Sequence, residues 1–275
     1  MQLDALFQQA QALPTIPKVA QELIQSFNDE DVAVGDIIRT ISTDQVLSAR
    51  LLRLANSAYY HVSRTVASVE DAVTMLGFVN VRTLVISTGL TGGFKSIPGM
   101  DLKRFWRHSL HTSVAARHLA KQIDLNSDLA FTVGLMHAIG QLVMHVAMPE
   151  VMLQMDKTLN ALDPRRVALE QQSFGYSYFD VGAELARRWK FPEEFANAIA
   201  ASGQPFDAGL FDPVGALVHI AAWRSRAEEN LLNAEEIEAG WPADVGARIG
   251  LPLGALLADL PPWAELSAGM EELIS

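Results

Sequence analysis

The stretch from Arg104 to Met144 constrains the fold of this chain more than any other. It contains two apolar helical patterns in succession, and the first carries His108, His111 and His118. At about 100° per residue, these three rings share about a third of the helix circumference. The second pattern carries His137. Because imidazoles that converge from two packed helices are what a metal site needs, the stretch predicts a helical protein with a candidate metal site.

Helical patterns also occupy most of the remaining sequence. Apolar residues recur at helical spacing near positions 3–12, 17–28, 34–41, 44–55 and 68–77. Asp44 or Thr43 is suited to cap one of these helices, and Ser68 another, which Gly77 ends. The β-branched segment 78–88 is compatible with a strand, but it lacks alternation and we predict a helix there. A Gly- and Pro-rich connection is expected at 91–101.

The later part of the chain predicts further helices. Two of them are expected to start near Pro149 and Pro164, because proline is tolerated in a first helical turn. An apolar helix follows Asp212, and the C-terminal tail is helical with breaks at its prolines. Trp241 and Trp263 are expected to hold this tail against the rest of the domain.

Composition excludes several classes of protein. There is no cysteine, so disulfides, thiol nucleophiles and Cys-ligated zinc are excluded. A net charge of −11 argues against nucleic acid as a partner. The N-terminus has no secretory pattern, and we expect no apolar run near the roughly 20 residues of a membrane helix. A cytoplasmic protein without a membrane partner is the resulting expectation.

Two sets of motifs carry a family resemblance. The segments LPTIPKVAQELI, TDQVLSARLLRLANSAYY and SVEDAVTMLGFVNVRTLVIS occur in order over about residues 13–90. They resemble the N-terminal half of the HDOD domain, the HD-related output domain of bacterial signalling proteins. The stretch with His108 and His137 resembles the HD superfamily of metal-dependent phosphohydrolases. One departure is Gln45, where the HDOD family usually has proline.

The resemblance implies a metal site whose ligands have been lost. His108 and His137 match the two motif histidines, but Ala138 stands where the HD pattern has its Asp. Ala222 stands where the family pattern has a second Asp. The family's further histidine positions hold Tyr178, Ser202 and Gly203, although Phe174, Gly175, Val181, Gly182, Ala183, Leu185, Trp189 and Pro192 match the surrounding pattern. We therefore expect no metal and no other cofactor, with His108 and His137 as vestigial ligands and His111 and His118 as weaker candidates for a histidine-only zinc site.

Other candidate sites are weaker still. The sequence has no nucleophile elbow and no kinase motif set, so no catalytic residue is assigned. The basic pairs Arg165-Arg166 and Arg187-Arg188 are interpreted as surface charge. Asn56, Tyr59 and Tyr60 lie near a predicted turn, where they either anchor a partner or close the core.

We predict one all-α, two-lobed HDOD-type domain over residues 1–275. Residues 1–95 form an N-terminal helical lobe, and residues 101–275 form a degenerate HD-like lobe. The resemblance implies a non-catalytic bacterial regulatory domain that binds a signalling protein or a small ligand, and the length favours a free-standing adaptor. The alternatives are a metal-dependent phosphohydrolase with an altered site, and a nucleotide sensor that uses the former HD cleft. The sequence predicts neither the oligomeric state nor the partner.

Overall fold

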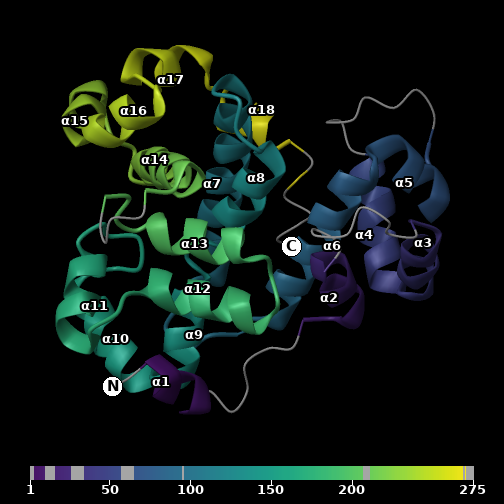
Figure 1. Cartoon of the computed structure of the whole chain (residues 1–275), viewed down its shortest axis with the longest axis horizontal. Helices are drawn as coiled ribbons and strands as arrows, with labels where there is room; N and C mark the ends of the chain where they lie inside the picture. Colours follow the sequence, from purple (N-terminus) through teal and green to yellow (C-terminus); the bar gives the residue numbers. More distant parts are fainter. Residues whose placement is uncertain are drawn as a thin grey trace.

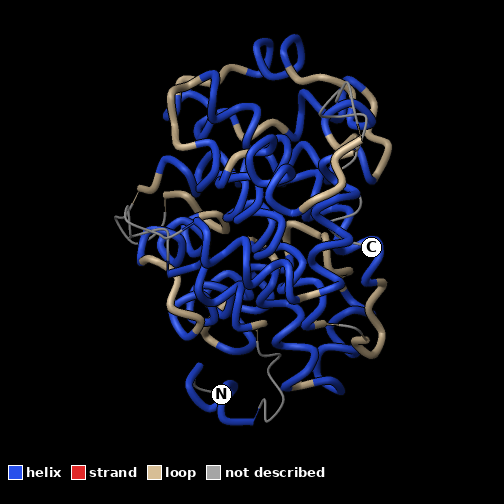
Figure 2. The backbone as a smooth tube through the Cα atoms, turned by 90° about the vertical axis from the view of Figure 1, so that its right-hand side faces the viewer, coloured by secondary structure: helices blue, strands red, loops and turns tan. Residues whose placement is uncertain are grey.

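The computed structural model describes residues 3–9, 16–25, 34–56, 65–94, 96–206, 211–268 and 270. Within these ranges every regular element is a helix, which confirms the all-α prediction (Figures 1 and 2). The first group of helices is α2 (Lys18–Gln25), α3 (Val34–Thr43), α4 (Gln45–Ala55), α5 (Val69–Leu76) and α6 (Phe78–Gly93). These helices pack on one another at one side of the molecule.

The second group forms the larger part of the molecule. It comprises α7 (Leu102–Gln122), α8 (Ser127–Met136), α9 (Ile139–Ala147), α10 (Pro149–Thr158), α11 (Arg166–Phe174), α12 (Tyr178–Arg188), α13 (Glu193–Ala201) and α14 (Pro213–Glu229). The long helix α7 packs against α8 and α14, and α12 packs between α9 and α13. The tail forms α15 (Ala234–Gly240), α16 (Ala243–Ile249), α17 (Leu253–Asp259) and α18 (Trp263–Leu266), of which α15 to α17 lie over α14 (Figure 1).

Local sequence signals account for several helix ends. The side chain of Asp44 accepts hydrogen bonds from two backbone N–H groups at the start of α4. Ser68 caps α5 in the same way, accepting from the N–H of Asp71. Gly77 has φ of +78°, which only glycine adopts freely, and it separates α5 from α6. The β-branched segment after Gly77 is helical as predicted, and α6 continues to Gly93, so the connection begins three residues later than expected.

The two groups of helices share one hydrophobic core. Buried apolar residues from both groups form a single continuous cluster. Arg117 of α7 joins them on the polar side, donating to Asn80 of α6 at 2.7 Å and to Asp128 of α8 at 3.1 Å. The two groups therefore pack together rather than standing apart as separate cores.

The first helix, α1 (Leu3–Gln9), lies apart from α2. It packs against α9 in the second group, and Figure 1 shows it next to α9 and α10. The guanidinium of Arg188 on α12 lies 4.3 Å from the centroid of the Phe7 ring and 3.4 Å from Asp4. Helix α1 therefore packs against the second group of helices rather than against the first.

One sequence expectation concerning apolar runs was wrong. The segment Ser127–Ala147 has the length and mean hydropathy of a membrane span, but 94% of its apolar 18-residue window is buried inside the protein. A bent pair of helices, Val69–Leu76 with Asn80–Gly93, meets the same criteria only if it is taken as one span. The first segment covers α8 and α9 and is the central part of the helical core.

Two close approaches between helices position the candidate site. A Cβ at Gly134 of α8 would lie 2.8 Å from the Cα of Ser113, so α7 and α8 touch there through backbone. A Cβ at Gly140 of α9 would overlap with the backbone of Tyr178 on α12. These contacts bring the turn between α8 and α9 against both α7 and α12.

Candidate functional site

The two motif histidines face each other inside the second lobe. His108 lies on α7, and His137 lies in the turn between α8 and α9 rather than inside one helix. Their ring centroids are 5.4 Å apart in an edge-to-face arrangement. Each residue is only 1% exposed. The sequence therefore identified two side chains that meet in space, and the structure places them in the core.

Hydrogen bonds hold both rings. His137 donates from Nδ1 to the backbone oxygen of Gly134 at 2.6 Å. Nδ1 of His108 lies 3.0 Å from the hydroxyl oxygen of Ser225 on α14. Nδ1 of each imidazole therefore has a hydrogen-bond partner.

The positions of the expected ligands hold side chains that cannot bind a metal. Ala138 and Ala222 are both buried, at 1% and 3% exposure. Ser202 donates its hydroxyl back to the oxygen of Ala198 in its own helix turn. A Cβ at Gly203 would overlap with the ring of Phe179, whose centroid is 6.4 Å from that of His137. An aromatic ring thus occupies the space beside His137.

The electrostatics of this region also oppose cation binding. Burial lowers the pKa of His108 well below its usual value, and the neighbouring His137 adds to the effect. Burial also lowers the pKa of His137, to about 4. The positive charge of Arg226 on α14 further lowers the pKa of both rings and of His219. Both motif histidines are therefore neutral at pH 7, which is the form that binds metals, and it is the positive charge of Arg226 that disfavours a cation beside them.

The residues present do not fit the metal that the HD resemblance implies. Among the residues that the structure describes, no three His, Asp or Glu side chains are grouped so as to hold an ion. The weaker candidates lie elsewhere on α7. The ring of His111 stacks on Trp263 of α18 at 4.8 Å, and Nε2 of His118 lies 3.2 Å from the amide of Gln122. The expected role of Trp263 in holding the tail is confirmed by this contact.

The candidate partner surface near Asn56 is only partly described. Asn56 donates to the oxygen of Val66 at 2.9 Å and accepts from its N–H at 2.8 Å. It therefore joins the two ends of the connection between α4 and α5, which is a structural role. Tyr59 and Tyr60 lie outside the described residues.

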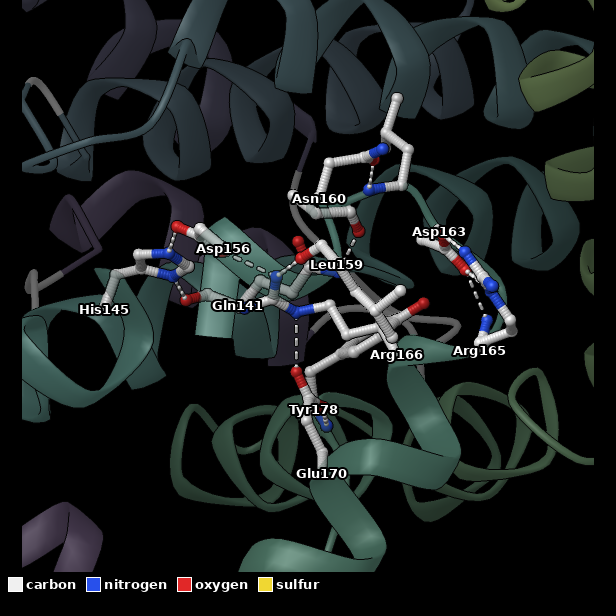
Figure 3. Close-up of polar contacts among 12 residues, drawn as sticks. Gln141, His145, Asp156, Leu159, Asn160, Asp163, Arg165, Arg166, Glu170 and Tyr178 are labelled. Atoms are coloured by element: carbon white, nitrogen blue, oxygen red, sulfur yellow. Dashed lines mark hydrogen bonds and ion pairs between the residues drawn. The ribbon is translucent and has the colours of Figure 1, made fainter. Parts of the chain in front are cut away.

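The sequence analysis did not predict a buried ionic network in the second group of helices, centred on Arg166. The interpretation of Arg166 as surface charge is wrong, because this residue is fully buried. It donates from Nη1 to Asp156 at 2.5 Å and from Nε to Glu170 at 2.9 Å (Figure 3). The spacing of four residues between Arg166 and Glu170 was the available signal, because such pairs share one helix face.

His145 completes this network. Its Nε2 lies 2.8 Å from a carboxylate oxygen of Asp156, and its Nδ1 lies 2.7 Å from the backbone oxygen of Gln141. The contact with Asp156 joins α9 to α10. Burial alone would raise the pKa of Asp156, but hydrogen bonds from His145 and Arg166 outweigh burial and lower it. The network therefore joins both carboxylates to Arg166 and one of them, Asp156, to the ring of His145.

The network extends to the start of α12. Glu170 accepts from the backbone N–H of Tyr178 at 2.7 Å, through the oxygen that does not bind Arg166. Burial raises the pKa of Glu170, and bonds from Tyr178 and Arg166 oppose that rise. The network thus connects α9, α10 and α11 through side chains, and a hydrogen bond to the backbone extends it to α12.

Comparison with known proteins agrees with these observations. The family model of the HDOD domain matches residues 13–205. A solved structure from Shewanella amazonensis SB2B, named "Putative phosphohydrolase", has a TM-score of 0.80 at 30% identity, over 98% of each chain. A "Putative signal transduction protein" from Marinobacter aquaeolei VT8 has a TM-score of 0.67 at 22% identity, over 98% of this chain and 59% of that one.

A curated relative extends well beyond this chain. A protein of Treponema pallidum (strain Nichols), described as uncharacterized, is 27% identical over 189 residues. The match spans 68% of this chain but only 37% of that relative. The motifs, the helical architecture and the family match together lead to one conclusion: this chain belongs to the HDOD domain family.

Proposed function

We propose that this chain is a non-catalytic regulatory domain of bacterial signalling, which acts by binding a protein partner or a small ligand. The observation that carries the proposal is the packing around His137. Its ring is buried against His108 and Phe179, and no carboxylate stands at positions 138 or 222. A hydrolytic metal must hold and activate water, which requires acidic ligands and an open coordination position.

The family setting supports the same proposal. The HDOD match covers most of the chain, and one protein with the same fold bears a signal-transduction name. The high share of buried residues in Ser127–Ala147 and the lack of cysteine are consistent with a cytoplasmic domain. With a net charge of −11, a protein or small ligand suits this surface better than nucleic acid.

The competing function is a metal-dependent phosphohydrolase, as the name of the Shewanella relative suggests. The two proposals are separated by measuring hydrolysis of p-nitrophenyl phosphate and bis-p-nitrophenyl phosphate with added Mn²⁺ or Mg²⁺. We expect rates equal to those of a matched His137→Gln variant at every metal concentration. Hydrolysis that needs metal and is lost on substituting His137 would overturn our proposal. A nucleotide sensor would need space beside His137 that the ring of Phe179 fills. Saturable binding of a nucleotide would support the sensor instead.

A further inference from the structure

A cavity of about 260 Å³ opens in the second lobe, separate from the two motif histidines. One wall is the turn at Gly99 and Met100 with the first turn of α7, which contributes Asp101, Arg104 and Phe105. The opposite wall is Asp156 with the connection that follows α10, residues 160–162. The cavity is slightly smaller than the pockets of roughly 300–1,000 Å³ that hold drug-sized ligands, so it suits a smaller molecule.

Arg104 has donors to offer in this cavity. Its one ion pair among the described residues joins Nε to Glu229 at 3.7 Å, which is a long contact. Glu229 is already held by Arg107 through two short hydrogen bonds, at 2.7 and 2.8 Å. Arg104 therefore remains available to bind a carboxylate, which a guanidinium fork matches well.

The two carboxylates of the cavity differ in whether they can accept a further hydrogen bond. Asp156 is committed, because one oxygen accepts from Arg166 and the other from His145. Asp101 uses Oδ1 to accept from the N–H of Arg104, and no bond to Oδ2 occurs within the described part of the chain. Asp101 can therefore accept from a ligand ammonium group while it caps α7.

The cavity thus carries one carboxylate and one guanidinium with unused hydrogen-bonding capacity at the start of α7, next to apolar surface from Phe105, Met100 and Leu162. A bare anion would meet the carboxylates of Asp101 and Asp156, and a bare cation would meet Arg104. A molecule with both charges and an apolar body suits Arg104, Asp101 and the apolar surface together. We propose that this cavity binds a small zwitterion with an apolar side chain, of the free α-amino acid class, with its carboxylate on Arg104 and its ammonium on Asp101.

This inference rests on the proposed regulatory function and specifies its ligand. Asp156 lies in the cavity wall and is also the member of the ionic network that joins α10 to α9 and α11. Arg166 and Glu170 continue the network to the N–H of Tyr178 at the start of α12 (Figure 3). A ligand that moves the wall at Asp156 would therefore act on α12, which gives the site a path to the rest of the lobe.

The test is isothermal titration of the full chain with four probes. L-leucine carries both charges, 4-methylpentanoate keeps the carboxylate and the apolar body, 3-methylbutylamine keeps the ammonium and a similar body, and inorganic phosphate is the anion control. We expect saturable binding of L-leucine, at least tenfold tighter than that of the other three. No saturation by L-leucine up to about 10 mM, or equal binding of phosphate or of either half-molecule, would overturn the proposal.

Variants locate the binding. Arg104→Gln and Asp101→Asn are each expected to weaken L-leucine binding at least tenfold, and asparagine retains the capping function of Asp101. Lys103→Gln is the matched control, because it removes an exposed positive charge next to Arg104 outside the cavity and should leave binding unchanged. Ala161→Phe, which fills the cavity, should abolish binding. Equal binding by Arg104→Gln and Lys103→Gln would contradict the site, with circular dichroism confirming that each variant is folded.

The outcome is separable from that of the proposed function. Hydrolysis dependent on metal and His137 would contradict the regulatory proposal whatever binds near Arg104. Failure of the L-leucine titration would remove only this site, because a protein partner would remain as the means of regulation.

Discussion

The imidazoles of His108 and His137 meet edge to face with their centroids 5.4 Å apart, in a region where each residue is 1% exposed. In a working metal centre the lone pairs of two such rings point at a shared ion, and acidic ligands complete the site. Here Nδ1 of His137 is bonded to Gly134, and Phe179 lies against the ring. The pair therefore forms part of a packed core.

The buried histidines predict a loss of stability in mild acid. The pKa of His137 is about 4 in the folded protein and about 6.5 when unfolded, so only the unfolded state takes up a proton between these values. Stability should therefore fall as pH falls from 6.5 towards 4, by about 2 kcal/mol at pH 5 from His137 alone. Urea denaturation at pH 7 and pH 5 measures this loss. His137→Gln should reduce the loss, and an identical loss in both proteins would contradict the assignment.

The contact between Gly203 and Phe179 predicts a steric requirement. Gly203→Ala should destabilise the protein by roughly 1–3 kcal/mol, because the added methyl group overlaps with a buried ring. The penalty should shrink in a Phe179→Leu background, which a double-mutant cycle of denaturation free energies can detect. Gly92→Ala is the control, since nothing lies within 4 Å of the position that its Cβ would take and alanine favours helix α6. Equal changes in the free energy of unfolding at the two glycines would show that the space beside Phe179 can hold the added methyl group.

The ionic network predicts a large effect for one of two adjacent arginines. Arg166→Met leaves Asp156 and Glu170 without their shared cation inside the protein, which should cost roughly 3–5 kcal/mol. Arg165→Gln removes the neighbouring arginine, whose side chain is 74% exposed and pairs with Asp163. That variant should keep the wild-type denaturation midpoint. A similar loss from both variants would mean that Arg166 is not the buried member.

The position of α1 predicts a specific local effect at Arg188. This side chain covers Phe7 and lies within ion-pair distance of Asp4, so Arg188→Gln should loosen α1 from α9 and α12. Hydrogen exchange should then become faster in Leu3–Gln9 and stay unchanged in α2. Arg187→Gln is the matched control, because Arg187 pairs with Glu193 instead. Unchanged exchange in α1 would show that other contacts hold this helix.

Sequence patterns predicted the helices because local chemistry set them. The caps at Asp44 and Ser68 and the break at Gly77 lie where the residue types indicated. The sequence placed His108 and His137 at the motif positions of two helices, and the structure shows that the two rings face each other. The four-residue spacing of Arg166 and Glu170 indicated only their pairing on α11. Burial of Arg166 was not predicted, because Asp156 on α10 and the backbone of Tyr178 on α12 reach this pair only through tertiary packing. The same holds for α1, whose contacts depend on residues more than 180 positions away, such as Arg188 with Asp4.

Elemental analysis of the purified chain tests the central claim, that the former metal centre is a closed core. Protein expressed with Mn²⁺, Zn²⁺ or Fe²⁺ in the medium, and then desalted, should contain far less than one metal ion per chain. Wild type and His137→Gln should give the same value. One equivalent of metal in the wild type, lost when His137 or His108 is replaced, would contradict the account.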